Sequence, residues 1–75
     1  MTIDEDKIDE AVLALLQLTL HDGVLAWKGH DWDVLSRLHA KGFIDNPVGK
    51  TKSIALSAEG LRESKRLFEV LFAKN

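Results

Sequence analysis

The chain has 75 residues, of which 45% are hydrophobic and 29% are charged, with one proline, five glycines and no cysteine. This length allows one small domain over residues 1–75, with a core too modest for an enzyme pocket, and the lack of cysteine excludes disulfides and cysteine zinc sites. The acidic N-terminal residues and the lack of a long apolar run indicate no export signal and no membrane span, so we expect a cytoplasmic protein.

Charge is divided unevenly along the chain. Residues 1–33 carry eight acids and two bases, a net charge of −6, whereas residues 34–75 carry eight bases and four acids, a net charge of +4. Such a division is compatible with a nucleic-acid-binding half, with two halves of one fold that attract each other, or with opposite patches on a dimer. The division alone does not choose between them.

Residues 3–20 are predicted to form the first helix. Thr2 and Glu5 have capping-box spacing, and acidic residues fill the first turn, where the helix dipole favours them. The apolar stripe at helical spacing consists of Ile8, Val12, Leu15, Leu16 and Thr19. Further leucines widen this stripe beyond what one neighbour covers, which predicts a homodimer with Leu13 and Leu20 among its contact residues. The first and last helices would then supply most of the dimer core.

A second helix is predicted from Trp32 to about Lys41, with Asp31 as its N-cap and Gly42 as its stop signal. Its inner face consists of Trp32, Leu35, Leu38 and His39, with Val34 at the margin, and its outer face consists of Asp33, Ser36, Arg37, Ala40 and Lys41. The preceding connector has room for one helical turn, and the sequence leaves open whether Val24–Lys28 forms it.

A β-hairpin and a third helix complete the chain. Phe43-Ile44 and residues 50–56 are predicted to pair around the turn at residues 45–49, which is rich in turn formers. Ser57 is predicted to cap a helix over residues 58–73. The apolar stripe of that helix consists of Leu61, Ser64, Phe68, Leu71 and Phe72, with Leu67 beside it.

The order of these elements resembles the second half of a winged helix-turn-helix domain. Leu35–Ile44 is similar to a recognition helix that enters the wing, and Leu56–Gly60 is similar to the segment after the wing in small bacterial repressors. The resemblance implies an α+β, winged-helix-like fold of the order helix–helix–β-hairpin–helix and a DNA-binding regulator. Only Gly23–Gly29 is available for the bracing helix of a full winged helix, so a protein-interaction or dimerisation module without DNA binding is the alternative.

The whole chain also resembles a family of short bacterial proteins described only as a domain of unknown function. The stretches that carry this resemblance are Asp6–Asp9, Ala26–Gly29 and Asp31–Leu35. This second resemblance identifies relatives and implies no activity.

Five residues are candidates for binding double-stranded DNA: Ser36, Arg37 and Lys41 on the second helix, and Lys50 and Lys52 on the wing. Arg37 is suited to bridge a guanine edge, whereas the lysines would contact phosphates without reading sequence. Asp33 on the same face repels phosphate, and the sequence pI of 5.8 is well below the value of about 9 that is typical of nucleic-acid-binding domains. DNA and an unidentified partner protein therefore both stay open.

Signals for other chemistry are weak. The three histidines lack the spacing of a metal site, and the chain has no nucleophile motif and no phosphate-binding glycine loop. We therefore expect no enzyme activity, no metal and no cofactor. Trp27 is a candidate partner-binding residue, because tryptophan is favoured at interface hot spots, or alternatively a core side chain.

Overall fold

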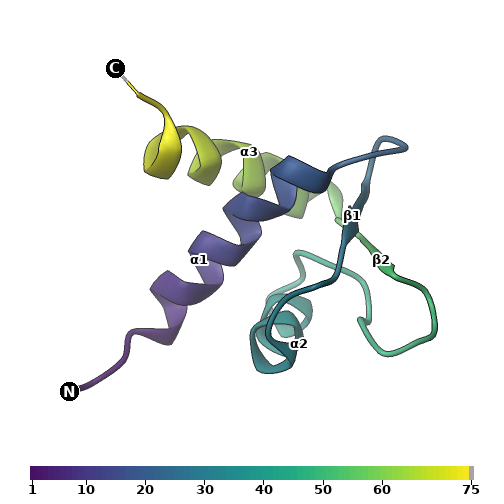
Figure 1. The fold of residues 1–75 in the computed structure, drawn as a ribbon, viewed down its shortest axis with the longest axis horizontal. Coiled ribbons are helices and arrows are strands. Elements are labelled where there is room, and N and C mark those ends of the chain that lie inside the picture. The colour runs from purple at the N-terminus through teal and green to yellow at the C-terminus, as the bar shows by residue number, and fades with distance from the viewer. Residues whose placement is uncertain (75) are drawn as a thin grey trace.

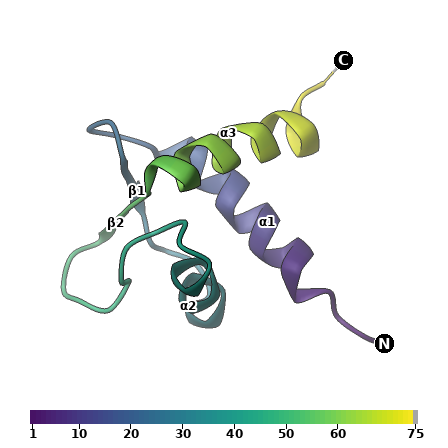
Figure 2. The ribbon, with the colours of Figure 1, turned by 180° about the vertical axis from the view of Figure 1, so that it is seen from behind.

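The computed structural model describes residues 1–74, in which helices and strands alternate around one sheet (Figure 1). In chain order the elements are α1 (Glu5–Leu15), the 3-10 helix η1 (Leu16–Thr19), β1 (Leu25–Trp27), α2 (Trp32–Ala40), β2 (Ser53–Ala55) and α3 (Ala58–Phe72). This confirms the predicted α+β class. α1 passes in front of α3 in Figure 1 and behind it in Figure 2, so these two helices form two layers.

α1 begins two residues later than predicted and buries a different face. The carboxylate of Asp4 accepts a hydrogen bond from the backbone N of Lys7 at 3.1 Å, so the predicted cap at Thr2 is wrong. The buried residues of α1 are Asp9, Leu13 and Ala14, whereas Ile8 is 40% exposed. The buried face includes Asp9 because Arg37 and Lys41 compensate the negative charge of the Asp9 carboxylate.

The predicted dimer contacts Leu13 and Leu20 face the interior of their own chain. Leu13 is only 1% exposed and belongs to the core, and Leu20 is partly buried against that core. The assignment of Leu13 to a partner surface is therefore wrong. α3 and α2 already cover the side of α1 on which it lies.

The connector after η1 forms a strand rather than a helical turn. β1 pairs with β2 in an antiparallel ladder in which Ala26 lies opposite Ile54. Both of these residues are almost fully buried. A segment of three residues is too short to show strand alternation by itself, and it becomes a strand because β2 offers it an edge and a buried apolar partner.

The predicted hairpin is reduced to one bridge. Ile44 pairs with Leu56, and the backbone N of Asp45 donates to the carbonyl oxygen of Ala55 at 2.9 Å. The Asp45 side chain in turn accepts from the backbone N of Ala55 at 2.9 Å. Because the side chain takes this amide and Pro47 has no N–H, the ladder does not extend into the loop.

α2 has the predicted ends, but its buried face is rotated. The Asp31 carboxylate accepts from the backbone N of Val34 at 3.2 Å, and Gly42 follows the helix with a φ of +83°. The buried residues are Val34, Leu35 and Leu38. Trp32 is 51% exposed and His39 is also exposed, so their assignment to the inner face is wrong. As a result, Arg37 and Lys41, rather than Trp32 and His39, lie toward α1.

α3 starts at the predicted cap, where the Ser57 hydroxyl accepts from the backbone N of Gly60 at 2.9 Å. Ser64 is completely buried, and its hydroxyl donates to the carbonyl oxygen of Leu13 at 2.6 Å in the last turn of α1. Figure 2 shows that the end of α3 projects away from α1. Leu71 and Phe72, predicted on the inner stripe, are accordingly each 46% exposed.

The core lies where α1, α2, α3 and the two strands meet. Its members are Leu13, Ala14, Leu16, Ala26, Val34, Leu35, Leu38, Ile44, Ile54, Leu56 and Leu67. Every element contributes at least one of these residues, so no single helix or strand completes the core alone. Within residues 1–74, no helix has both the length and the apolarity needed to cross a bilayer.

Candidate functional site

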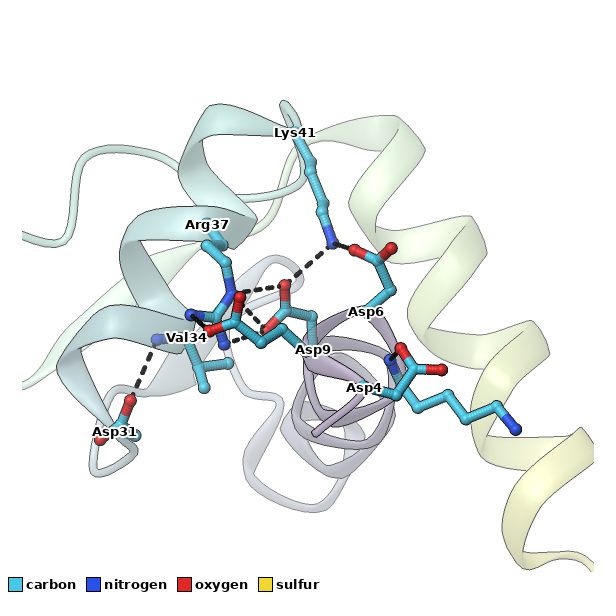
Figure 3. A network of polar contacts seen from close by, with 9 residues as sticks. Asp4, Asp6, Asp9, Asp31, Val34, Arg37 and Lys41 are labelled. Atoms are coloured by element: carbon cyan, nitrogen blue, oxygen red, sulfur yellow. Dashed lines mark hydrogen bonds and ion pairs between the residues drawn. The ribbon is translucent and has the colours of Figure 1, made fainter. Parts of the chain in front are cut away.

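A buried carboxylate, that of Asp9, joins α1 to α2 (Figure 3). The Nε of Arg37 lies 3.0 Å from Oδ1 and 2.9 Å from Oδ2 of Asp9, and its Nη2 lies 2.8 Å from Oδ1. The Nζ of Lys41 lies 2.9 Å from Oδ2. Asp9 itself is only 1% exposed. Lys41 is the C-cap residue of α2 and follows Arg37 by one helical turn, which is why both reach the same carboxylate.

Two exposed acids extend this cluster along α1. Glu5 lies 3.2 Å from Nη1 of Arg37, and Asp6 lies 3.1 Å from Nζ of Lys41. Both acids stand about one turn before Asp9, so acids spaced by a turn on α1 face bases spaced by a turn on α2. The contacts confirm one of the three interpretations of the uneven charge, in which the two halves of the fold attract each other.

The cluster keeps its groups charged. Burial by itself raises the pKa of Asp9, but hydrogen bonds from Arg37 and Lys41 outweigh that effect and hold the pKa below its ordinary value. The hydrogen bond to Asp9 is also the main reason that the pKa values of Arg37 and Lys41 are raised. The directions of these pKa shifts favour the charged forms of Asp9, Arg37 and Lys41, which makes the three residues unsuited to proton transfer near neutral pH. The ion pairs of Asp9 with Arg37 and Lys41 instead hold α1 against α2, and we call these three residues the clamp.

Arg37 is half-buried rather than solvent-facing as predicted, whereas Lys41 is exposed as predicted, but the cationic groups of both residues are bound to Asp9. The side chain of Arg37 is 29% exposed and that of Lys41 is 35% exposed. Ser36 is exposed, as predicted, and its charged neighbour on the outer face is Asp33. α2 therefore exposes Asp33 and Ser36 on its outer face, while the cationic groups of Arg37 and Lys41 are bound to acids of α1.

A groove beside β1 brings together residues that the sequence analysis assigned to two different partners. It has a volume of about 490 Å³ and is lined by Trp27, Lys28, Gly29, Gly49, Lys50, Thr51 and Lys52. Trp27 is 49% exposed because its neighbour Ala26 takes the buried side of the strand. The predicted DNA-contacting lysines of the wing, Lys50 and Lys52, therefore lie next to the predicted partner-binding tryptophan.

The loop that forms the other wall of this groove is fastened to β1. Lys28 follows the strand, and its Nζ donates to the carbonyl oxygens of Pro47 at 2.9 Å and Gly49 at 3.1 Å. The backbone N of Lys28 also donates to the carbonyl oxygen of Lys52 at 3.0 Å. The ammonium group of Lys28 thus holds the shape of the loop, whereas Lys50 and Lys52 are exposed at its rim.

A second candidate surface is the outer face of α1 and η1. Ile8, Ala11, Val12 and Leu15 recur at helical spacing, and Leu18 continues the row. We call this row the α1 stripe. Ile8 is 40% exposed and Leu18 is 68% exposed, while the three residues between them are half-buried. The stripe lies on the face of α1 turned away from Asp9 and Leu13.

Sequence reasoning missed the clamp because it followed apolar residues only. Asp9, Leu13 and Leu16 share one buried face, but the predicted apolar stripe of the first helix did not include Asp9. The available signal was the pair Arg37 and Lys41 at i, i+4, which matches the spacing of the acids of the first helix and carries the opposite charge.

Among residues 1–74, no group of three or more histidines and acids is placed to hold a metal ion.

Comparisons with known proteins give a family and a relative. The model of a domain of unknown function, DUF6429, matches residues 4–74. The chain is 60% identical over 74 residues to the uncharacterised protein y4hR of Sinorhizobium fredii strain NBRC 101917 / NGR234, covering 99% of this chain and 100% of that protein. No solved structure matches the chain.

Proposed function

The chain belongs to the family of the domain of unknown function DUF6429, and we propose that it is a non-catalytic interaction module that pairs with a second copy through the α1 stripe. The observation that carries the proposal is the row of apolar side chains on the outer face of α1 and η1, which is exposed at its two ends, Ile8 and Leu18, and half-buried between them. Apolar side chains scattered singly on a surface need no explanation, whereas a continuous row marks an interaction site.

A second copy fits this face better than an unrelated partner for reasons of length and charge. An interface of standard size buries about 800 Å² per partner, roughly a sixth of the 5158 Å² surface of this chain. A stripe along a whole helix is complementary to itself when two copies lie antiparallel. The antiparallel arrangement also separates the acidic N-terminal turns of the two helices, which a parallel pair would bring together.

The order of elements supports a trimmed winged-helix-like arrangement as the scaffold of this module. β1 lies between the first two helices and pairs with β2, which follows the wing, and Ile44 bridges to Leu56 on the other side. α2 directly precedes the wing, as a recognition helix would. Reading of double-stranded DNA by α2 is not part of the proposal, since Arg37 and Lys41 are bound to Asp9.

We expect the wild-type chain to sediment at twice its monomer mass of 8.4 kDa and the double variant Ile8→Glu, Leu18→Glu to sediment as a monomer. Burying unpaired charges in the paired stripe raises the dissociation constant by about 100-fold or more. Both side chains are exposed in the single chain, so the variant keeps its circular dichroism spectrum. Sedimentation equilibrium over a range of protein concentrations measures the effect.

The matched control is Val48→Glu, which places a charge on an apolar side chain that is 72% exposed but lies in the loop before β2. This variant is expected to remain a dimer. A wild-type chain that stays monomeric at high concentration, or a Val48→Glu variant that dissociates equally, contradicts the proposal.

A further inference from the structure

We propose that the groove beside Trp27 binds single-stranded nucleic acid, with a base stacked on the indole ring and the neighbouring phosphates held by Lys50 and Lys52. The site is separate from the α1 stripe, so this inference does not depend on dimerisation. Of the residues predicted to contact nucleic acid, the proposed site keeps Lys50 and Lys52 in the loop before β2, and it uses Trp27 of β1 instead of the residues of α2.

The first argument is that Trp27 is an exposed aromatic ring held in place from behind. Its ring centroid lies 4.8 Å from that of His21, with an interplanar angle of 31°. The imidazole is itself fixed, because its Nδ1 lies 2.7 Å from the carbonyl oxygen of Thr19. The backbone N of Trp27 donates to the hydroxyl of Thr19 at 3.0 Å. A ring that is half-exposed yet fixed on one side is a platform on which a nucleobase stacks without further ordering.

The second argument is charge. The groove is lined by three lysines and by no carboxylate. Lys28 uses its ammonium group to fasten the loop, which leaves Lys50 and Lys52 at the rim to meet a ligand. The acids at the start of α1 lie far from the groove, because in Figure 1 the loop before β2 and the start of α1 are on opposite sides of the molecule. The local charge is therefore positive although the chain as a whole carries −2.

The third argument distinguishes single strands from a duplex. A base stacks on Trp27 only when its face is free, and in a duplex both faces are covered by neighbouring base pairs. A helix that reads a duplex lies in the major groove and presents free cationic side chains there, whereas Arg37 and Lys41 are both bound to Asp9. An aromatic platform beside free lysines is the combination that single-strand-binding surfaces use.

The experiment uses tryptophan fluorescence in a Trp32→Phe background, so that Trp27 is the reporter. Oligothymidylate of about ten nucleotides is expected to quench this fluorescence at about 50 mM salt, and the quenching weakens at about 200 mM salt. The double variant Lys50→Ala, Lys52→Ala is expected to lower the slope of log affinity against log salt by about 1.4, because each phosphate contact on a single strand contributes about 0.7.

Fluorescence anisotropy of a labelled oligothymidylate tests the platform itself in the otherwise wild-type chain. Trp27→Ala is expected to lower affinity by about tenfold, whereas Trp27→Phe keeps most of it, since a phenyl ring still stacks. The matched controls are Trp32→Ala, which removes a similarly exposed tryptophan on α2, and Lys65→Ala, which removes an exposed lysine of α3. Neither control is expected to change the affinity by more than about twofold. Thermal melts show whether each variant is folded.

Three outcomes overturn the inference. The first is the absence of binding at about 50 mM salt. The second is an equal loss of affinity in Trp27→Ala and Trp32→Ala. The third is tighter binding of a duplex, or of an acidic peptide of the same charge, than of the oligothymidylate. The monomeric Ile8→Glu, Leu18→Glu variant is expected to retain its nucleic-acid-binding site, which keeps this test independent of the proposed dimer.

Discussion

Replacement of Gly60 by alanine is expected to lower the free energy of unfolding by about 3 kcal/mol or more. Gly60 lies in the first turn of α3, and a Cβ at this position falls within the carbonyl group of Phe43. That carbonyl is fixed by hydrogen bonds from the backbone N of Ser57 at 2.9 Å and from the Ser57 hydroxyl at 3.3 Å. The obstacle is therefore backbone that cannot move aside without breaking the cap of α3.

Urea denaturation of the Gly60→Ala variant measures this loss directly. Gly29→Ala is the matched control, because an added Cβ there meets nothing within 4 Å. It also lies in the connector between β1 and α2, so the same change of residue is expected to leave stability within about 1 kcal/mol of wild type. A Gly60→Ala variant that unfolds at the wild-type urea concentration would show that α3 does not approach residue 43 as closely as described.

Asp9→Asn is expected to lower the free energy of unfolding at neutral pH by about 2 kcal/mol, because the amide no longer compensates two cations that share one buried site. The pKa of Asp9 is lower in the folded chain than its ordinary value, so its contribution is fully present above the unfolded pKa of about 3.9. The contribution is lost as the pH falls through the lowered folded pKa. The difference between wild type and variant should therefore be constant near neutral pH and shrink in acid.

Urea denaturation at neutral pH and again in acid tests both parts of this prediction. Glu5→Gln is the control, because Glu5 also contacts Arg37 but its side chain is 65% exposed. Exposed pairs contribute less than about 1 kcal/mol, so this variant is expected to resemble wild type. Equal stabilities of Asp9→Asn and Glu5→Gln at neutral pH would mean that burial of the Asp9 carboxylate does not strengthen the clamp.

Three features that depend on neighbouring residues were predicted correctly, although the local cap expected at Thr2 lies at Asp4 instead. The caps at Asp31 and Ser57 and the stop at Gly42 are local, since each joins a side chain or a positive φ to a helix end within three residues. The strand at Leu25–Trp27 was missed because it exists only through β2, nearly thirty residues away. Pairing over that distance leaves no periodic signal in a segment of three residues.

The second feature that the sequence did not predict is which face of each helix is buried. Helical spacing identifies which residues share a face, but not which of two apolar faces will be buried, and α1 has one through Leu13 and another through Ile8. Asp9 decides between them, and its effect depends on Arg37 in a different helix. For the same reason the groove at Trp27 could not be predicted as one site. Its tryptophan and its lysines meet only after β1 and β2 have paired.

The packing of α3 against α1 has a consequence for protein synthesis. α1 leaves the ribosome before α3, which carries Ser64 and Leu67, two residues that cover it. Until α3 emerges, Leu13 and Leu16 lack the cover that α3 provides, and the nascent chain displays a helix that is apolar on two sides. We therefore expect folding to be completed only after translation of α3, and a transcript truncated just before the codon for Ala58 to yield an aggregation-prone fragment.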